Sequence, residues 1–291
     1  MVVGSTKTGT VLRVITYIIL IAGAASMIIP FVWMISTSLK EVDQISDFPL
    51  KWIPEPIKWK NYTDAWFLKQ RAADRPVWYL APFARFFFNS IFIAVTVTLG
   101  QVFTSAMAAF AFARLQWKGR DKVFVSYLAT MMVPGQVTMI PVFILIKKLQ
   151  WVDTYQALIL PAMFSAYGTF MLRQFFLSIP RSLEEAATID GASTWKIFIS
   201  IILPLSKPAL ATLTTFTFMG SWNSFLWPLV VTNSMEMRTL PVGVAVFQSQ
   251  FGTQWALLMA GAMITLMPVL IIYIFNQRFF VKGIALSGMK G

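Results

Sequence analysis

Six long apolar stretches, separated by segments that hold the charged residues, make up most of the chain. They cover residues 14–35, 86–112, 123–146, 155–172, 208–231 and 255–275, and none contains Asp, Glu, Lys or Arg. A helix of about 20 apolar residues crosses the roughly 30 Å hydrocarbon core of a bilayer. The pattern predicts six transmembrane helices, the fourth of which is only just long enough.

The composition supports an all-α polytopic membrane protein. Of the 291 residues, 57% are hydrophobic and 12% are charged, whereas about a quarter of the residues of a soluble domain are charged. Lys7 and Arg13 precede the first apolar stretch, as they would in a signal peptide. That stretch is longer than the apolar core of a typical signal peptide, so we expect it to be a retained helix.

The basic residues indicate the orientation. With six crossings and both termini in the cytoplasm, the cytoplasmic segments hold 13 basic and 4 acidic residues, against 11 and 8 outside. Basic residues favour the cytoplasmic side. We therefore predict a cytoplasmic N-terminus (1–13), a six-helix transmembrane permease domain (14–280) and a cytoplasmic tail (281–291). The domain includes an extracytoplasmic loop at 40–85 and a cytoplasmic loop at 179–207.

Several kinds of chemistry are excluded by composition. The chain has no His and no Cys, which excludes disulfides, imidazole or thiolate metal sites and a Ser-His-Asp triad. It has no phosphate-binding G-x-x-x-x-G-K-[ST] motif. The net charge of +12 is spread between apolar runs, which does not suggest nucleic-acid binding. We predict no catalytic residue, no metal site and no bound cofactor.

The cytoplasmic loop at 179–207 has a legible local pattern. Pro180 should end the preceding helix, and the spacing of Ser182 and Glu185 is that of a capping box. Gly191 suits the left-handed position that closes a helix. A short helix is therefore predicted between Ser182 and Gly191.

A second short helix should follow at once. Ser193 or Thr194 can cap it, and Pro204 should mark where it has ended. The loop is thus predicted to be a rigid helix-turn-helix.

Small residues recur on the second apolar stretch. Ser105, Ala109 and Ala113 are four residues apart and share one face of a helix. Such a face allows close approach of a neighbouring helix.

The same loop carries a family resemblance. Glu185-Ala186-Ala187, then Gly191, then Ile201-x-Leu203-Pro204 matches, without gaps, the EAA signature of permease subunits in binding-protein-dependent ABC importers. Further similar segments are Asn89-Ser90, Ala111 to Leu115, Met132-Val133-Pro134, Trp222 to Pro228, Thr239 to Gly243 and Gln277 to Gly283. Together they resemble the MalG-like subunits of carbohydrate importers over nearly the whole chain from about residue 12.

The resemblance implies a coupling role for the loop, in which it docks on a cytoplasmic ATPase and Glu185 pairs with a basic group there. The implied coupling residues are Glu184, Glu185, Ala186, Ala187, Asp190, Gly191, Leu203 and Pro204. Glu185 could instead only cap its own helix. The implied ATPase-contacting tail residues are Lys282, Gly283, Ser287 and Lys290; a basic tail on anionic lipid is the alternative.

The fifth apolar stretch holds the candidate substrate pathway. Trp222, Asn223, Ser224 and Trp227 place aromatic faces, an amide and a hydroxyl at membrane depth, which suits sugar rings. Helix-packing aromatics, with Asn223 bonded to a neighbouring helix, remain an alternative. The loop at 232–254 resembles the segment with which the family enters the cleft of the binding protein.

The function implied is import of a sugar or oligosaccharide across the cell membrane of a prokaryote. The implied partners are a homologous second permease, two copies of an ABC ATPase that binds ATP and Mg, and an extracytoplasmic solute-binding protein. A phosphorylated polyol such as glycerol 3-phosphate is an alternative cargo, although no basic residue lies within the spans. An ion-coupled carrier or an integral membrane enzyme is the alternative from another class.

The loop at 40–85 is rich in Pro and Trp. Its indoles could lie at the level of the lipid headgroups or cover a docking protein.

Overall fold

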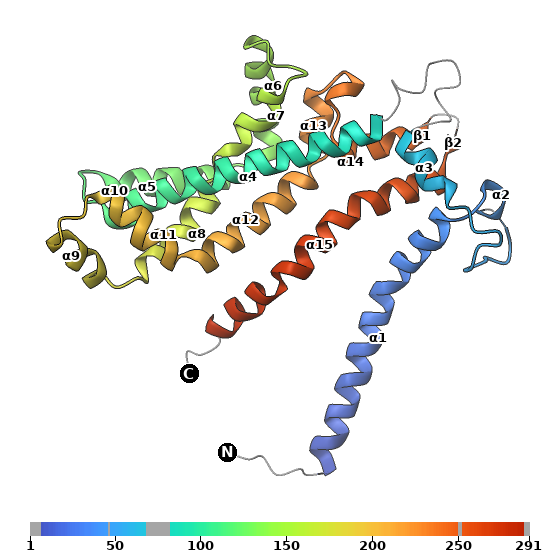
Figure 1. Ribbon diagram of the computed structural model, residues 1–291, viewed down its shortest axis with the longest axis horizontal. Helices are drawn as coiled ribbons and strands as arrows, with labels where there is room; N and C mark the ends of the chain where they lie inside the picture. Colours follow the sequence, from blue (N-terminus) through green and yellow to red (C-terminus); the bar gives the residue numbers. More distant parts are fainter. Residues whose placement is uncertain (1–6, 46, 68–81, 250–251, 288–291) are drawn as a thin grey trace. The chain divides into compact units, whose positions relative to one another are not determined.

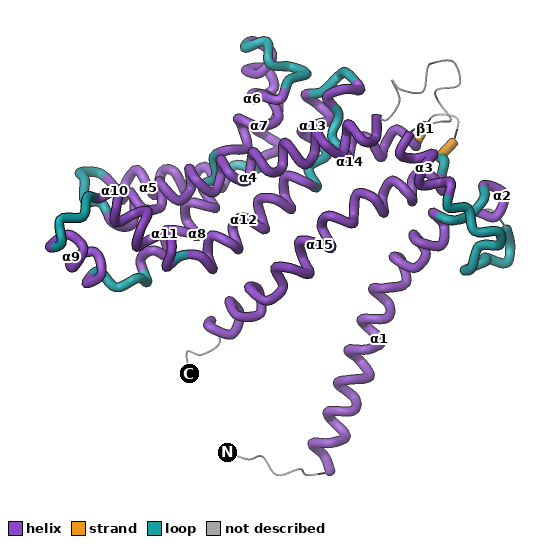
Figure 2. Tube along the Cα trace, viewed as in Figure 1, coloured by secondary structure: helices purple, strands orange, loops and turns teal. Residues whose placement is uncertain are grey.

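The computed structural model describes residues 7–45, 47–67, 82–249 and 252–287, and these residues are mostly helical (Figures 1 and 2). They fall into two compact units. The first unit consists of residues 1–81 and 244–266, and the second of residues 82–243 and 267–291. The predicted all-α class is confirmed, since the described chain adds only two strands of two residues each.

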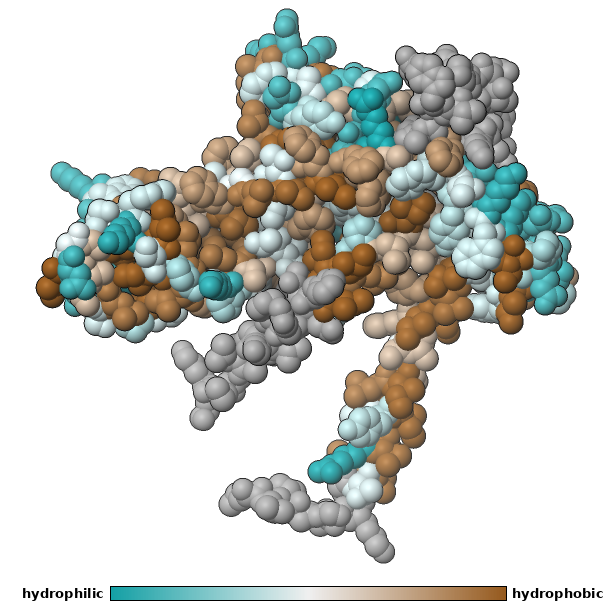
Figure 3. All heavy atoms as spheres, viewed as in Figure 1, coloured by the Kyte–Doolittle hydropathy of each residue, from teal (hydrophilic) through white to brown (hydrophobic). Residues whose placement is uncertain are grey.

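The first unit is built around one long helix and a short segment after it. Its helices are α1 (Lys7–Ser38), α2 (Val42–Ile45), α3 (Lys60–Phe67), the 3-10 turn η7 (Ala245–Phe247) and the first part of α15 (Trp255–Ser287). β1 (Gln248–Ser249) and β2 (Gly252–Thr253) pair antiparallel. The surface over α1 is largely hydrophobic in Figure 3, as expected for a helix that faces lipid.

The second unit contains the remaining helices. They are α4 (Pro82–Arg114), α5 (Arg120–Ala129), η3 (Thr130–Met132), α6 (Gly135–Lys148), α7 (Tyr155–Ile159), η4 (Leu160–Met163), α8 (Ala166–Leu177), α9 (Ser182–Ile189), α10 (Thr194–Ile197), η5 (Phe198–Ile202), α11 (Leu203–Leu205), α12 (Lys207–Trp222), α13 (Leu226–Val231), η6 (Met235–Met237) and α14 (Leu240–Val244). Of these, η5 is a π-helical turn and the other η elements are 3-10 turns. α4 packs along both α8 and α12.

The membrane spans are less regular than predicted. Among the described residues, three continuous helices are long and apolar enough to cross a bilayer: Thr10–Ser38, Phe83–Arg114 and Trp255–Ile274. Two more candidates are bent pairs, Arg120–Met132 with Gly135–Lys148 at 99° and Thr194–Leu205 with Lys207–Trp222 at 79°. The predicted fourth span, broken into α7, η4 and α8, does not qualify. The count of six remains a prediction.

The small residues of α4 do allow close helix packing. Ser105, Ala109 and Ala113 are all buried, and α8 crosses them at Gly168. A Cβ atom added to Gly168 would lie only 2.7 Å from Oγ of Ser105. The predicted close approach is confirmed, because no larger residue fits at this crossing.

Candidate functional site

One buried arginine holds the start of the coupling loop, residues 179–207. Arg114 ends α4, and 2% of its side chain is exposed. Its guanidinium donates hydrogen bonds to the carbonyl oxygens of Phe176 and Ile179, and its Nε lies 3.0 Å from Oε1 of Glu184. One side chain therefore joins the ends of α4 and α8 to the start of α9.

α9 begins without the predicted capping box. Arg181 occupies the N-cap position, with helical dihedral angles, and its carbonyl oxygen accepts hydrogen bonds from the amides of Glu184 and Glu185. The prediction that Ser182 caps the helix is wrong, because the chain is already helical at Arg181 and Ser182 is the first residue of α9. Since no side chain caps this end, the exposed Glu185 carboxylate has no capping role.

α9 ends as predicted, at a glycine in the left-handed conformation. Gly191 has φ of +79°. Its amide donates to the carbonyl oxygen of Thr188, and the amide of Ala192 donates to that of Ala187, at 3.0 and 2.9 Å. This pair of bonds is the Schellman motif, and it fixes the direction in which the chain leaves α9.

The second helix of the loop is longer than predicted. Oγ of Ser193 accepts a hydrogen bond from the amide of Lys196 and caps α10. The helix then continues through the π turn η5 into α11, and Pro204 lies inside it. The prediction that it ends before Pro204 is wrong, because the chain stays helical through the wider π turn and Pro204 is the second residue of α11. The backbone bends at Ser206, before α12.

The two faces of α9 differ in character. Ala187, together with Ala192, packs against the hydrophobic cluster of α4, α8 and α12. On the outside, Leu183 and Ile189 are 43% and 87% exposed, and Ile189 lies one turn after the exposed Glu185. Two other implied coupling residues, Ala186 of α9 and its C-cap residue Asp190, are also exposed. The outward face is therefore apolar and acidic.

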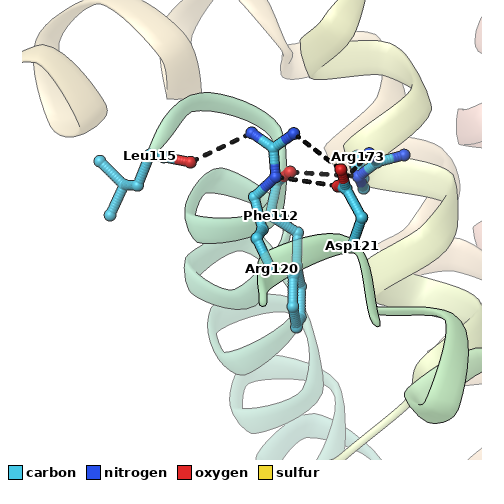
Figure 4. Close-up of polar contacts among 5 residues, drawn as sticks. All are labelled: Phe112, Leu115, Arg120, Asp121 and Arg173. Atoms are coloured by element: carbon cyan, nitrogen blue, oxygen red, sulfur yellow. Dashed lines mark hydrogen bonds and ion pairs between the residues drawn. The ribbon is translucent and has the colours of Figure 1, made fainter. Parts of the chain in front are cut away.

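A second charged cluster fixes the turn between α4 and α5 (Figure 4). Arg120 Nε donates to Oδ1 of Asp121 at 3.0 Å and Arg120 Nη1 donates to the carbonyl oxygen of Leu115. Arg173 of α8 lies 4.0 Å from the same carboxylate and donates to the carbonyl oxygen of Phe112. The end of α4, the start of α5 and Arg173 within α8 are thus tied together.

A cavity of about 370 Å³ lies within the second unit, between α4, α8 and α12. Its polar lining residues are Ser90, Gln101, Ser165, Tyr167, Thr217, Ser221, Ser224 and Thr239. Gln101 Nε2 donates to Oγ1 of Thr217 at 2.9 Å, which fixes the amide at the wall. None of the described residues that line this cavity is charged. Hydroxyls, one amide and aromatic rings make it suitable for an uncharged polar molecule.

The four candidate pathway residues separate into two groups. Ser224 and Trp227 line this cavity and a second one of about 680 Å³ near the bend before α6. Trp227 Nε1 also donates to the carbonyl oxygen of Ala157 at 2.9 Å. Trp222 is buried against Phe87 and Phe218 and lines neither cavity; Asn223 is exposed and lines neither.

Two segments that are distant in the sequence meet at the other end of α4. Asn89 Nδ2 donates to the carbonyl oxygens of Glu236 and Arg238, and Ser90 Oγ accepts from the amide of Leu240 at 2.7 Å. The sequence resemblance included both segments but did not predict that they touch. The 236–240 segment is thereby held beside the cavity, which Ser90 and Thr239 line.

A carboxylate secures the neighbouring loops. Asp153 accepts hydrogen bonds from the amides of Asn233 and Ser234 at 2.9 and 3.1 Å, and its own amide donates to the carbonyl oxygen of Val231. Burial raises the pKa of Asp153, but the bonds from Ser234 and Asn233 outweigh it and leave the pKa below the ordinary 3.8.

The implied tail residues are only partly within the structure. Lys282, Gly283 and Ser287 belong to the backbone of α15, whereas Lys290 lies outside the described residues. Their proposed contact with an ATPase stays a prediction.

Sequence reasoning gave no role to Arg114, Gln101 or Asp153. Arg114 stood within one of the family-like segments, at the end of an apolar stretch. That position signalled the end of a helix, but only the packing of α4 against α8 brings its guanidinium to Glu184.

Comparisons with known proteins agree with this architecture. Residues 101–285 match the family described as the binding-protein-dependent transport system inner membrane component. The chain is 40% identical, over 70% of its length and 74% of the relative, to an arabinooligosaccharides transport system permease protein of Halalkalibacterium halodurans. It is 35% identical, over 94% of its length and 96% of the relative, to an sn-glycerol-3-phosphate transport system permease protein of Yersinia enterocolitica.

A solved structure shows the same fold. A chain from a bacterial ABC transporter involved in the import of the acidic polysaccharide alginate superposes with a TM-score of 0.82. The two are 22% identical, and the match covers 96% of this chain and 99% of the other. With the family match over most of the chain and relatives matched along most of their length, the protein belongs to the family of binding-protein-dependent transport system inner membrane components, the permease subunits of ABC transporters.

Proposed function

We propose that this permease subunit imports a sugar or oligosaccharide, and that α9 transmits the motion of a cytoplasmic ATPase to the spans. The observation that carries the proposal is the anchored geometry of α9. Its outer face is exposed, while Glu184 on its inner side is held by Arg114 of α4. A displacement of α9 is therefore transferred to α4 and α8 instead of being absorbed by a loose loop.

The proposed assembly contains a homologous second permease, two copies of an ABC ATPase and an extracytoplasmic solute-binding protein. The family description supports the binding protein. Because this chain lacks a phosphate-binding motif, ATP and Mg belong to the ATPase. With α9 facing the ATPase and the six crossings predicted from the sequence, both termini lie in the cytoplasm in this assembly.

The lining of the cavity supports an uncharged cargo. Gln101, Ser221 and Ser224 supply an amide and hydroxyls, and Trp227 supplies an aromatic face. A neutral saccharide presents hydroxyls and apolar C–H faces that match such groups. The similarity to arabinooligosaccharide permeases points the same way.

A phosphorylated polyol is the second candidate. The similarity to glycerol-3-phosphate permeases extends over 94% of the chain, which favours it. A buried phosphate needs cationic partners, and the described lining of both cavities offers none. An ion-coupled carrier and a membrane enzyme, the alternatives from other classes, do not fit the family to which the chain belongs.

The test is uptake by the importer reconstituted in vesicles with its ATPase and binding protein. Arabinooligosaccharide and glycerol 3-phosphate, offered separately, distinguish the two cargoes. Glu185→Ala should leave the complex assembled but lower uptake at least about tenfold, because removing one partner of a charge pair that is buried at an interface costs about 2 kcal/mol or more. Asp43→Ala, at an exposed carboxylate of α2 outside the coupling loop, is the matched control. Normal uptake by an assembled Glu185→Ala complex would contradict the coupling role.

A further inference from the structure

The segment that follows α1 folds back beside the last turns of that helix. The ring of Trp52 meets the ring of Trp33 edge-on with centroids 5.2 Å apart, and Ser36 Oγ donates a hydrogen bond to the carbonyl oxygen of Trp52. At a rise of 1.5 Å per residue, Trp33 lies about 7.5 Å before the end of α1 at Ser38. Trp52 is therefore level with the apolar part of the span and does not lie beyond its end.

Several contacts hold this fold-back in place. Lys40 is buried, with Nζ 4.0 Å from the centre of the Trp33 ring. Asn61 Nδ2 donates to the carbonyl oxygens of Ser38 and Lys40 at 3.0 and 2.8 Å. The hydroxyls of Ser38 and Tyr62 are 2.8 Å apart. The segment is therefore fixed to the end of α1.

Large hydrophobic side chains cover the outside of this segment. Phe48 and Ile53, which lie on either side of Trp52 in the sequence, are 95% and 74% exposed. Leu50, Trp52, Ile57 and Trp59 are exposed as well. Figure 3 shows hydrophobic patches on this segment beside polar surface. They continue the surface of α1, of which no side chain in the most apolar window is buried.

The charge of the segment argues against electrostatic attraction to anionic lipid. Residues 41–67 contain three lysines and five acidic residues: Lys51, Lys58, Lys60, Glu41, Asp43, Asp47, Glu55 and Asp64. The segment instead presents apolar and aromatic side chains, and tryptophan is enriched at the membrane–water interface.

We propose that residues 48–59 form an interfacial anchor, which inserts its hydrophobic side chains into the lipid leaflet on the side of the membrane where α1 ends. The anchor sets the depth of α1 in the bilayer, because Trp52 and Trp33 are in direct contact. In this proposal, lipid covers the exposed hydrophobic side chains of residues 48–59. Because the contact is hydrophobic, insertion of the segment does not depend on the charge of the lipid.

Spin labels can test the depth of the anchor, since the chain has no native cysteine. Single cysteines replace Phe48, Ile53 and, as the control on α3, the exposed Thr63. Each full-length chain is labelled with a nitroxide and placed with its copurified partners in phosphatidylcholine vesicles, with or without phosphatidylglycerol. Collision rates are measured with oxygen and with a water-soluble nickel chelate.

The labels at 48 and 53 should show an oxygen-to-chelate collision ratio at least about fivefold above that at 63, because the chelate, which is polar but carries no net charge, is excluded from hydrocarbon. The ratio should not change with phosphatidylglycerol. Chelate access at 48 and 53 equal to that at 63 would overturn the proposal. So would labels that are open to the chelate in vesicles and shielded only when a binding protein is added. If either labelled chain fails to assemble, cysteines at Leu50 and Ile57 provide the same measurement.

Discussion

Nε of Arg114 lies 3.0 Å from Oε1 of Glu184, whereas the carboxylate of the next residue, Glu185, is exposed. Successive residues of a helix point about 100° apart, so two adjacent glutamates of one motif face different partners. Glu184 faces α4 and Glu185 faces outward. The sequence resemblance assigned both to coupling; in the structure Glu184 pairs with Arg114 of α4, and the coupling role of both glutamates stays a prediction.

Breaking this ion pair should destabilise the second unit. Arg114→Ala removes the partner of Glu184 and the donor to the carbonyl oxygens of Phe176 and Ile179. Losing one partner of a buried pair costs about 3 kcal/mol. Thermal unfolding of the detergent-solubilised chain should show this loss, together with faster proteolysis within residues 179–207.

The matched control is Glu185→Ala, which removes an exposed carboxylate from the same helix and should cost less than about 0.5 kcal/mol. The double variant Arg114→Ala with Glu184→Ala should be less destabilised than the sum of the two single variants, because their effects share one contact. Full additivity would argue against a direct pair.

Gly191 gives a separate test of the loop. Its φ of +79° is a left-handed conformation, and a Cβ atom would meet nothing within 4 Å. Gly191→Ala should therefore cost about 1 kcal/mol from backbone strain alone. Gly23→Ala in α1 is the control, since it too has open space but lies in a regular helix, where alanine is favoured. Equal effects of the two substitutions on the unfolding temperature would contradict the assignment.

The sequence predicted best those features that depend on local chemistry. The left-handed glycine at 191 and the cap at Ser193 follow from the side chains themselves. The breaks in the predicted spans could not be predicted in this way. Apolar composition indicates how many residues can lie in the membrane, but not where the helix changes direction. The apolar composition of residues 208–231 therefore did not predict that the helix stops at Trp222. The Arg114–Glu184 pair depends on how α4 packs against α8, and a single sequence does not give that packing.

Overpacking at Gly243 tests the contact between α4 and α14. A Cβ atom on Gly243 would lie 2.1 Å from Cδ2 of Phe86, whose side chain is fully buried. Gly243→Ala should cost about 1–3 kcal/mol. Phe86→Leu should restore part of that loss in the double variant, although alone it is destabilising. An unchanged unfolding temperature in Gly243→Ala would show that Phe86 can move aside.

The hydrogen-bonded carboxylate of Asp153 should make the stability of the protein depend on pH. Burial raises the pKa of Asp153, but the hydrogen bonds from the side chain of Ser234 and from the amides of Asn233 and Ser234 leave it lowered. The contribution to stability is therefore complete above the unfolded value of 3.8 and is lost as the pH falls through the folded pKa. Asp153→Asn keeps a side chain that tolerates the left-handed backbone here, φ of +63°, and removes only the charge. Near pH 6 it should lower stability by about 1 kcal/mol. Unfolding temperatures of both chains should converge only as the pH falls below 3.8, through the folded pKa of Asp153. A gap between wild type and Asp153→Asn that stays constant down to about pH 3 would show that the carboxylate charge contributes nothing to this contact.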